Sequence, residues 1–252
     1  MSNLDNADCS PGDGFPESGW AGSVVIRSEN TGHVGGKIVA IARPHVGTEV
    51  AAYNGFSSSD SNTTNYLPML FREKWGYNSA IYVQNISGST LPADDIVITF
   101  YDTTGVEVCA YEDHESLVNN ATRGYWLPFI QCNNGYEFPA TGGWAGSAKI
   151  ETTGNVIAVG RPHLSDGQVV VYNAFTGGQN QVFAPFNFRT WGSNETALYI
   201  QNLGLTDTTA TIRLYDEQDG FYCQMEQIVT PGSAGAIWLA NLTNATCVPE
   251  TP

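Results

Sequence analysis

The sequence predicts an all-β protein made of two tandem immunoglobulin-like β-sandwich repeats. Aromatic residues form 12% of the chain, and Tyr, Phe and Trp favour strands over helices. The 27 glycines and 12 prolines divide the chain into short pieces, as the turns of a sandwich or barrel require. An internal repeat predicts the tandem arrangement.

The repeat consists of sequence blocks that recur in the same order, at offsets between 112 and 124 residues. Because the offset drifts, insertions must lie between the blocks, which is where loops are expected. The matched blocks are 19–23 (Gly-Trp-Ala-Gly-Ser) with 143–147, 38–45 with 156–163, 53–54 with 172–173, 80–85 with 197–202, and 99–102 with 213–216. Cys109 and Cys132 likewise match Cys223 and Cys247.

Each matched block has the pattern of a strand. In the block 96–101, Ile96, Ile98 and Phe100 share one face, as the two-residue period of a strand dictates, and we expect this face to point inward. The second copy keeps Ala210, Ile212 and Leu214 on that face. The other expected strands are Ser23–Arg27, Lys37–Arg43, Glu49–Tyr53, Ser79–Asn85, Glu107–Tyr111 and Arg123–Leu127.

The boundary between the two units is open to two interpretations. The first gives one repeat at residues 1–134, with 1–15 as an irregular N-terminal arm, and a second repeat at 135–252. The second places one whole domain at about 75–185, flanked by two halves that cannot fold alone. Those halves would then close on each other within the chain, or on a neighbouring molecule in a head-to-tail polymer.

The formal net charge of −15 excludes some partners. Nucleic acids and anionic membrane surfaces require many Lys and Arg residues, so neither is an expected partner. No run of 18 apolar residues occurs, so no membrane insertion is expected. We expect no cofactor, although the carboxylates leave Ca²⁺ binding possible.

The cysteines predict disulfides. Cys109 and Cys132 are separated by 23 positions and Cys223 and Cys247 by 24, as two homologous intradomain disulfides would be. Reduced core cysteines are the alternative. Disulfides would place the protein in an oxidising compartment, outside the cell or at its surface. Cys9 is left over, and is either a free thiol or bonds to another chain.

Three further groups of residues are candidate sites. The duplicated Arg-Pro-His is either a pocket for an anion or a glycan, or a turn that ends a strand. The tryptophan pairs Trp20/Trp144, Trp75/Trp191 and Trp126/Trp238 are expected in cores, with sugar stacking as the alternative. The ligand candidates are therefore Arg43, His45, Arg161 and His163, and sequons that predict a glycoprotein begin at Asn62, Asn85, Asn120, Asn194, Asn241 and Asn244.

The order of motifs also resembles a repeat found in uncharacterised bacterial surface and secreted proteins. The shared marks are a strand ending in Gln84-Asn85, then Tyr101-Asp102 ahead of Gly105, then the block 143–147. The resemblance covers most of residues 16–247 and implies tandem β-sandwiches and extracellular placement. It brings no catalytic residues.

Together these features predict a structural protein rather than an enzyme. The sequence has no nucleophile elbow, zinc-protease, phosphate-loop or dinucleotide motif. The leading hypothesis is a subunit of a self-assembling extracellular filament, sheath or surface layer, with the chain itself as its partner. The alternative is a glycan-binding adhesion module of a cell-surface protein.

Overall fold

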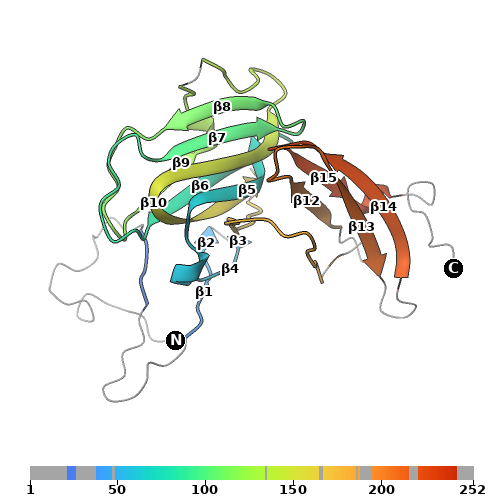
Figure 1. The fold of residues 1–252 in the computed structure, drawn as a ribbon, viewed down its shortest axis with the longest axis horizontal. Helices are drawn as coiled ribbons and strands as arrows, with labels where there is room; N and C mark the ends of the chain where they lie inside the picture. Colours follow the sequence, from blue (N-terminus) through green and yellow to red (C-terminus); the bar gives the residue numbers. More distant parts are fainter. Residues whose placement is uncertain are drawn as a thin grey trace.

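The protein is all-β, as predicted (Figure 1). The computed structural model describes residues 22–26, 38–46, 49–133, 135–164, 167–185, 187, 195–215 and 221–242. Within these residues the chain forms strands and three short 3-10 helices, η1 Ser58–Asp60, η2 Leu127–Phe129 and η3 Leu239–Asn241. No helix in this part of the chain has the length and apolarity needed to cross a membrane.

Seven strands form one large antiparallel sheet, which we call the complete unit. Its main path runs β8-β7-β10-β6-β9, and β5 and β11 also pair with β10. The strands are β5 Asn62–Arg72, β6 Tyr77–Asn85, β7 Val97–Asp102, β8 Glu107–Glu112, β9 Thr122–Trp126, β10 Trp144–Leu164 and β11 Tyr172–Asn173.

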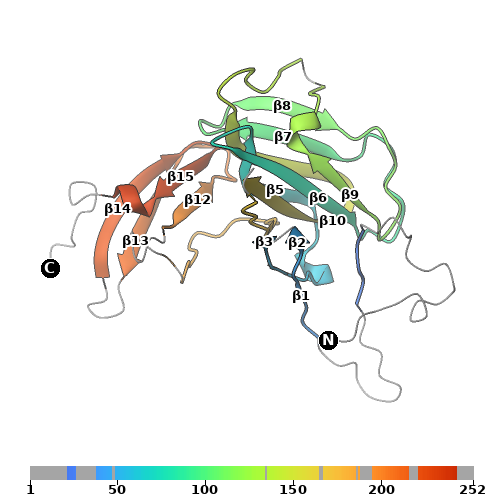
Figure 2. The ribbon, with the colours of Figure 1, turned by 180° about the vertical axis from the view of Figure 1, so that it is seen from behind.

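The long strand β10 organises the complete unit. Through residues 144–151 it pairs with β5 on one edge and β7 on the other. Through residues 156–164 it pairs with β6, and Val159 and Gly160 pair with β11. The register shifts between Glu151 and Val156, as in a bulge, so the sheet curls where β10 changes partners (Figures 1 and 2).

The curled sheet encloses the main hydrophobic core. The expected inward face of β7 is confirmed, because Ile96, Ile98 and Phe100 are all fully buried. β10 adds side chains from both halves of its length, among them Ile150 and Val156. Alternate residues on each strand therefore fill one core, as the two-residue period predicts.

Two smaller groups of strands flank the complete unit. The N-terminal hairpins contain β1 Ile41–Ala42, β2 His45–Val46, β3 Glu49–Val50 and β4 Tyr53–Asn54, with β1 paired to β4 and β2 to β3. The open unit contains β12 Ala197–Gln201, β13 Thr208–Tyr215, β14 Phe221–Val229 and β15 Ala234–Trp238, with β12 paired to β15 and β13 to β14.

The large sheet crosses the boundary expected between residues 134 and 135. β10 lies after that boundary, yet its partners β5, β6 and β7 lie before it. This arrangement matches the alternative interpretation, in which one whole domain occupies the middle of the chain. Whether each copy makes an immunoglobulin-like sandwich stays a prediction.

The prediction of a strand at Ser23–Arg27 is wrong for the residues of that range that the structure describes. Residues 23–26 are not in a strand, and Arg27 lies outside the described residues. Of the expected strand Lys37–Arg43, Lys37 lies outside the described residues, and within 38–43 only Ile41 and Ala42 are in a strand. A strand needs a neighbouring strand to satisfy its backbone groups, and here the described N-terminal residues have only their own hairpin partner.

Candidate assembly interface

The open unit repeats four strands of the complete unit in the same register. In the complete unit Ile81 is paired with Tyr125, and in the open unit Leu198 at the equivalent position is paired with Ile237. The second strand pairs match in the same way: β7–β8 and β13–β14 share one register, including a bulge after Phe100 and after Leu214. The sequence duplication is therefore visible as a structural duplication.

The loops that follow β6 and β12 are held by the same hydrogen bonds from a buried asparagine. Asn85 at the end of β6 is buried, and its Nδ2 donates to the carbonyl oxygens of Ser89 (2.7 Å) and Leu117 (2.8 Å). In the open unit, Nδ2 of Asn202 donates to the carbonyl oxygens of Thr206 and Val229, both at 2.8 Å. The Gln-Asn motif thus fixes a loop, which explains why it recurs.

The units differ in what lies between their middle strands. In the complete unit β10 stands between β7 and β6 and pairs with both. In the open unit, β12 pairs only with β15 and β13 only with β14 among the described residues, apart from one isolated bridge at Asn202. We call the two free edges, of β12 and of β13, the acceptor edges.

The missing strand leaves apolar side chains partly uncovered. Ile81, Val83, Ile98 and Phe100 are fully buried in the complete unit. Their equivalents in the open unit are only partly buried and surround a small core of three buried residues. Those equivalents are Leu198, Ile200, Ile212 and Leu214.

The N-terminal hairpins resemble the strands that the open unit lacks. β1 pairs with β4 through Ile41–Asn54 and Ala42–Tyr53, which matches the Val159–Asn173 and Gly160–Tyr172 pairs of β10 and β11. Within the part of the chain that the structure describes, the first repeat therefore has the hairpin but no neighbouring sheet for it, and the open unit has the sheet edges but no such hairpin.

Equivalent apolar residues accordingly have opposite burial. Ile26 is 60% exposed, whereas Ile150 at the same repeat position is 0% exposed. Ile38 is 51% exposed, whereas its equivalent Val156 is 0% exposed. Isolated exposed apolar side chains are ordinary, but a set that matches a core strand position by position indicates a missing partner.

Residues 22–26 and the open unit contact opposite ends of the complete unit, whereas the hairpin of β1 and β4 lies beside β11, where Asn173 Nδ2 donates to the Asn54 carbonyl oxygen at 3.0 Å. The Ser23 hydroxyl donates to the carbonyl of Asn120, next to the end of β6. The open unit contacts the other end, where the rings of Phe71 and Tyr199 are 6.3 Å apart and Thr230 Oγ1 donates to the Thr104 carbonyl at 2.6 Å. Figures 1 and 2 show β13 and β14 projecting away from the large sheet on that side.

The Gly-Trp-Ala-Gly-Ser motif fits β10 between its neighbours. A Cβ on Gly146 would lie 2.0 Å from the Tyr101 carbonyl oxygen, and one on Gly143 would lie 2.1 Å from the Glu73 carbonyl oxygen. Between these glycines, Trp144 is buried against Phe100, with ring centroids 5.8 Å apart. The motif therefore allows a strand to pack closely between two neighbouring strands of a sheet. Residues 19–23 have the same motif.

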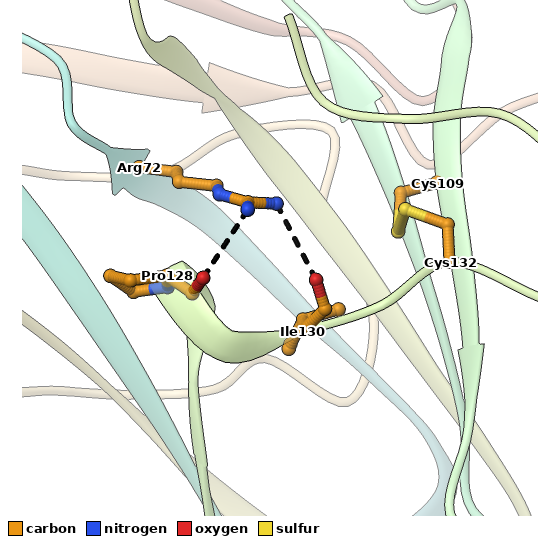
Figure 3. The surroundings of a disulfide bond; sticks show 5 residues. All are labelled: Arg72, Cys109, Pro128, Ile130 and Cys132. Carbon is orange, nitrogen blue, oxygen red and sulfur yellow. Dashed lines mark hydrogen bonds between the residues drawn. A yellow bond between two sulfur atoms is a disulfide. The ribbon is translucent and has the colours of Figure 1, made fainter. Parts of the chain in front are cut away.

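The disulfide prediction is confirmed for Cys109 and Cys132, whose Cα atoms are 5.1 Å apart (Figure 3). The bond ties β8 to the segment after η2. Beside it, Arg72 donates to the carbonyl oxygens of Pro128 (3.2 Å) and Ile130 (3.5 Å). Cys223 is disulfide-bonded as well, whereas Cys9 and Cys247 lie outside the described residues.

The two Arg-Pro-His candidates differ in position: β1 ends at Ala42, directly before Arg43, whereas Arg161-Pro162-His163 lies within β10. Arg161 and His163 share one face of β10, which continues to Leu164, and the His163 ring packs edge-on against Trp126 at 4.9 Å. Arg43 is exposed beside β1, and the side chain of His45 lies outside the described part of the chain. Anion or glycan binding at these residues stays a prediction.

The tryptophan expectation is only partly correct. Trp144 is in the core, but Trp75 is 62% exposed, because it lies at a positive φ of 52° in the turn between β5 and β6. Lys74 Nζ lies 5.4 Å from the centroid of the Trp75 ring. Trp20 and Trp191 lie outside the described residues.

The sequons divide by exposure. Asn62, Asn120 and Asn241 are exposed, whereas Asn85 is buried with its Nδ2 engaged, so the folded protein offers no free amide for a glycan there. Asn194 and Asn244 lie outside the described residues.

An exposed group of titratable residues does not match a Ca²⁺ site. Asp94, Glu112 and His114 bring ligand atoms within 4.8 Å of one another. Ca²⁺ takes six to eight oxygen ligands, and this group contains an imidazole. His114 Nδ1 lies 2.5 Å from Asp94 Oδ1, and this hydrogen bond raises the pKa of His114. The group is a surface ion pair.

Sequence reasoning missed a buried charged network. Asp113 is buried, and its Oδ2 accepts hydrogen bonds from Arg123 Nη1 (2.5 Å) and Tyr125 Oη (2.7 Å). Burial and the neighbouring Asp113 raise the pKa of Tyr125 well above its usual value. The open unit has Gln227, Gly235 and Ile237 at the equivalent positions. Comparing the two repeats at these three positions could have shown that Asp113, Arg123 and Tyr125 occur together in only one of them.

Comparison of the chain with family models, with curated proteins and with solved structures found no match. Function must therefore be argued from the geometry. The described residues combine one complete unit, one unit with free sheet edges, and one hairpin that has the sequence of the missing strand. This arrangement can form further sheet pairing with another chain.

Proposed function

We propose that this protein is an extracellular structural subunit that polymerises with copies of itself into a filament, sheath or surface layer. One observation carries the proposal: the described residues contain two copies of one sheet, and within them only one copy has its central strand. Free edges and a partly exposed apolar face are what natural sheets avoid unless they are paired.

The geometry favours open polymers over closed dimers. Residues 22–26, which repeat the first part of β10, and the open unit contact opposite ends of the complete unit, while the hairpin of β1 and β4 contacts β11. A contact between unlike surfaces at opposite ends is head-to-tail, and such contacts generate filaments when the rotation does not close. Each added subunit would present the same free end to the next.

Extracellular placement is supported by the cysteines. The Cys109–Cys132 bond and the disulfide at Cys223 belong to an oxidising compartment. A structural polymer outside the cell also gains from such bonds, because closing a loop of this length contributes about 3 kcal/mol in the chain-entropy model.

Sedimentation velocity across a wide range of concentrations, followed by electron microscopy of negatively stained samples, tests this function. We expect the size distribution to shift with concentration and elongated or sheet-like assemblies to be visible. A single monomeric species at every concentration, with no assembly in the micrographs, would overturn the proposal.

A further inference from the structure

We infer that the strand missing from the open unit is supplied by residues 22–26 and 38–46 of a second copy of this chain, which we call the donor segment. The inference rests on the proposed function and names the surface through which the copies join. Its basis is that the complete unit already displays the same contact between the same two sequence blocks.

The repeat fixes the register of the contact. In the complete unit Ile150 is paired with Ile98, and Ala158 with Val83. At the equivalent positions of the repeat, Ile26 of the donor segment pairs with Ile212 on β13 of the neighbouring copy. Ala40 pairs in the same way with Ile200 on β12. The donor segment thus fills both acceptor edges at once, as β10 does.

Side-chain character agrees with this register. Ile26 and Ile38 occupy the positions of fully buried Ile150 and Val156, so they face the half-covered apolar side chains of the open unit. Val25 occupies the position of Lys149, which is only partly buried and forms an ion pair with Glu151 at 2.9 Å. In this register the side chain of Ile26 therefore points into the core of the open unit, and the side chain of the adjacent Val25 points outward.

The charges are complementary although the whole chain has a net charge of −15. The stretch 20–46 has three basic residues, Arg27, Lys37 and Arg43, against the single acidic Glu29. The stretch 195–242 has six acidic residues and one basic residue. Charge of opposite sign favours this encounter over random contacts between acidic surfaces.

The donor must come from a second copy because the linker is short. Residues 55–61 join the hairpin at Asn54 to β5 at Asn62, and these eight Cα–Cα steps reach at most about 29 Å when extended. The 3-10 helix Ser58–Asp60 shortens that reach. From Asn62 to Phe71, β5 itself covers about 30 Å, and the open unit begins only at the Phe71 end.

Directed cross-linking between two variants of the full chain tests the register. One variant carries Val25→Cys and the other Arg213→Cys, each in a Cys9→Ser background, because Lys149 is paired with Thr99 at the equivalent positions. After mixing and mild oxidation we expect a covalent dimer with one copy of each variant. Thr209→Cys replaces Arg213→Cys as the matched control, and lies too far along β13 for a disulfide.

Two substitutions at adjacent positions test the burial. Ile26→Glu places a carboxylate where the contact is apolar, and we expect it to weaken assembly at least tenfold. Val25→Glu faces outward toward Arg213, and we expect its assembly to stay within about threefold of the unaltered protein. Both residues are exposed in the separate chain, so the thermal midpoints of the two variants should not differ.

The outcomes separate this inference from the proposed function. Polymers that form normally with Ile26→Glu, and that give no Val25–Arg213 cross-link, would overturn the donor contact while self-assembly stands. A chain carrying both cysteines that forms only an internal bond at every dilution would show closure within one chain and would also overturn it. No self-association at all would overturn both.

Discussion

Asp113→Ala should destabilise the complete unit more than any other single loss of a charge. The Asp113 side chain is 4% exposed and its partner Arg123 is 24% exposed. The substitution removes the acceptor of Arg123 Nη1 and of Tyr125 Oη. It leaves the mostly buried guanidinium with only the exposed Glu115 carboxylate, 3.3 Å from Arg123 Nη2, as its counter-ion, and it leaves a buried hydroxyl without its acceptor.

The expected cost follows from these contacts. Removing one partner of a buried ion pair costs about 3–5 kcal/mol. Arg123 keeps the carbonyl oxygens of Glu115 (3.1 Å) and Ser116 (3.0 Å) and remains partly hydrated, which favours the lower end of that range. We therefore expect the free energy of unfolding to fall by about 3 kcal/mol.

Urea unfolding with the disulfides intact, followed by intrinsic fluorescence, measures this change. The exposed Asp94→Ala is the matched control and should move the midpoint far less, because surface pairs contribute little. Replacing the network as a whole, with Asp113→Ala, Arg123→Met and Tyr125→Phe together, should cost less than the single change, because no buried charge is left unpaired. A loss below about 1 kcal/mol for Asp113→Ala, or a larger loss for the triple variant, would refute the reasoning.

Three further predictions concern the repeat and the ion pair. Ile150→Ala should lower the free energy of unfolding by about 3 kcal/mol. Ile26→Ala, at the same repeat position, should change the free energy of unfolding of the separate chain by less than about 0.5 kcal/mol. Chemical denaturation of both variants at low protein concentration measures the two changes. Asn202→Ala should cost about 2 kcal/mol, because it leaves two carbonyl oxygens of a buried loop without a donor, and faster hydrogen exchange in residues 203–207 would locate the loss. Asp94→Asn should return the raised pKa of His114 toward 6.5 in an NMR titration. Because the folded pKa is raised, any stabilisation from this pair is present below the unfolded pKa and is lost as pH rises through the folded pKa.

Local pattern predicted the strands that have partners within the chain. β6, β7, β8 and β9 lie within a residue or two of their expected positions, because alternation and turn residues act over short distances. The Cys109–Cys132 bond followed from matched spacing. In contrast, the same pattern predicted a strand at Ser23–Arg27, and the described residues of that range, 23–26, are not in a strand. Alternation indicates which residues can form a strand, but it does not indicate whether a neighbouring strand is present.

Other features depended on contacts between distant segments. The Asp113–Arg123–Tyr125 network joins β9 to the loop after β8, and no residue in it is unusual when taken alone. The role of β10 was also hidden, because a strand that pairs with β5, β6, β7 and β11 cannot be recognised from its own sequence. The repeat constrained the choice of boundary to two possibilities, and the pairing of β10 with β5, β6 and β7 crosses the one at residues 134 and 135.

The open unit gives a physical reason for self-assembly that does not depend on a ligand. A two-stranded sheet is marginally stable in water, and the open unit consists of two such sheets whose contiguous core cluster has three buried side chains among the described residues. Anything that binds the folded form stabilises it in proportion to its free concentration. A donor segment that restores the contacts of β10 would therefore complete the core of the open unit and join two subunits in a single step. In the proposed polymer, folding of this unit and growth would then be thermodynamically linked.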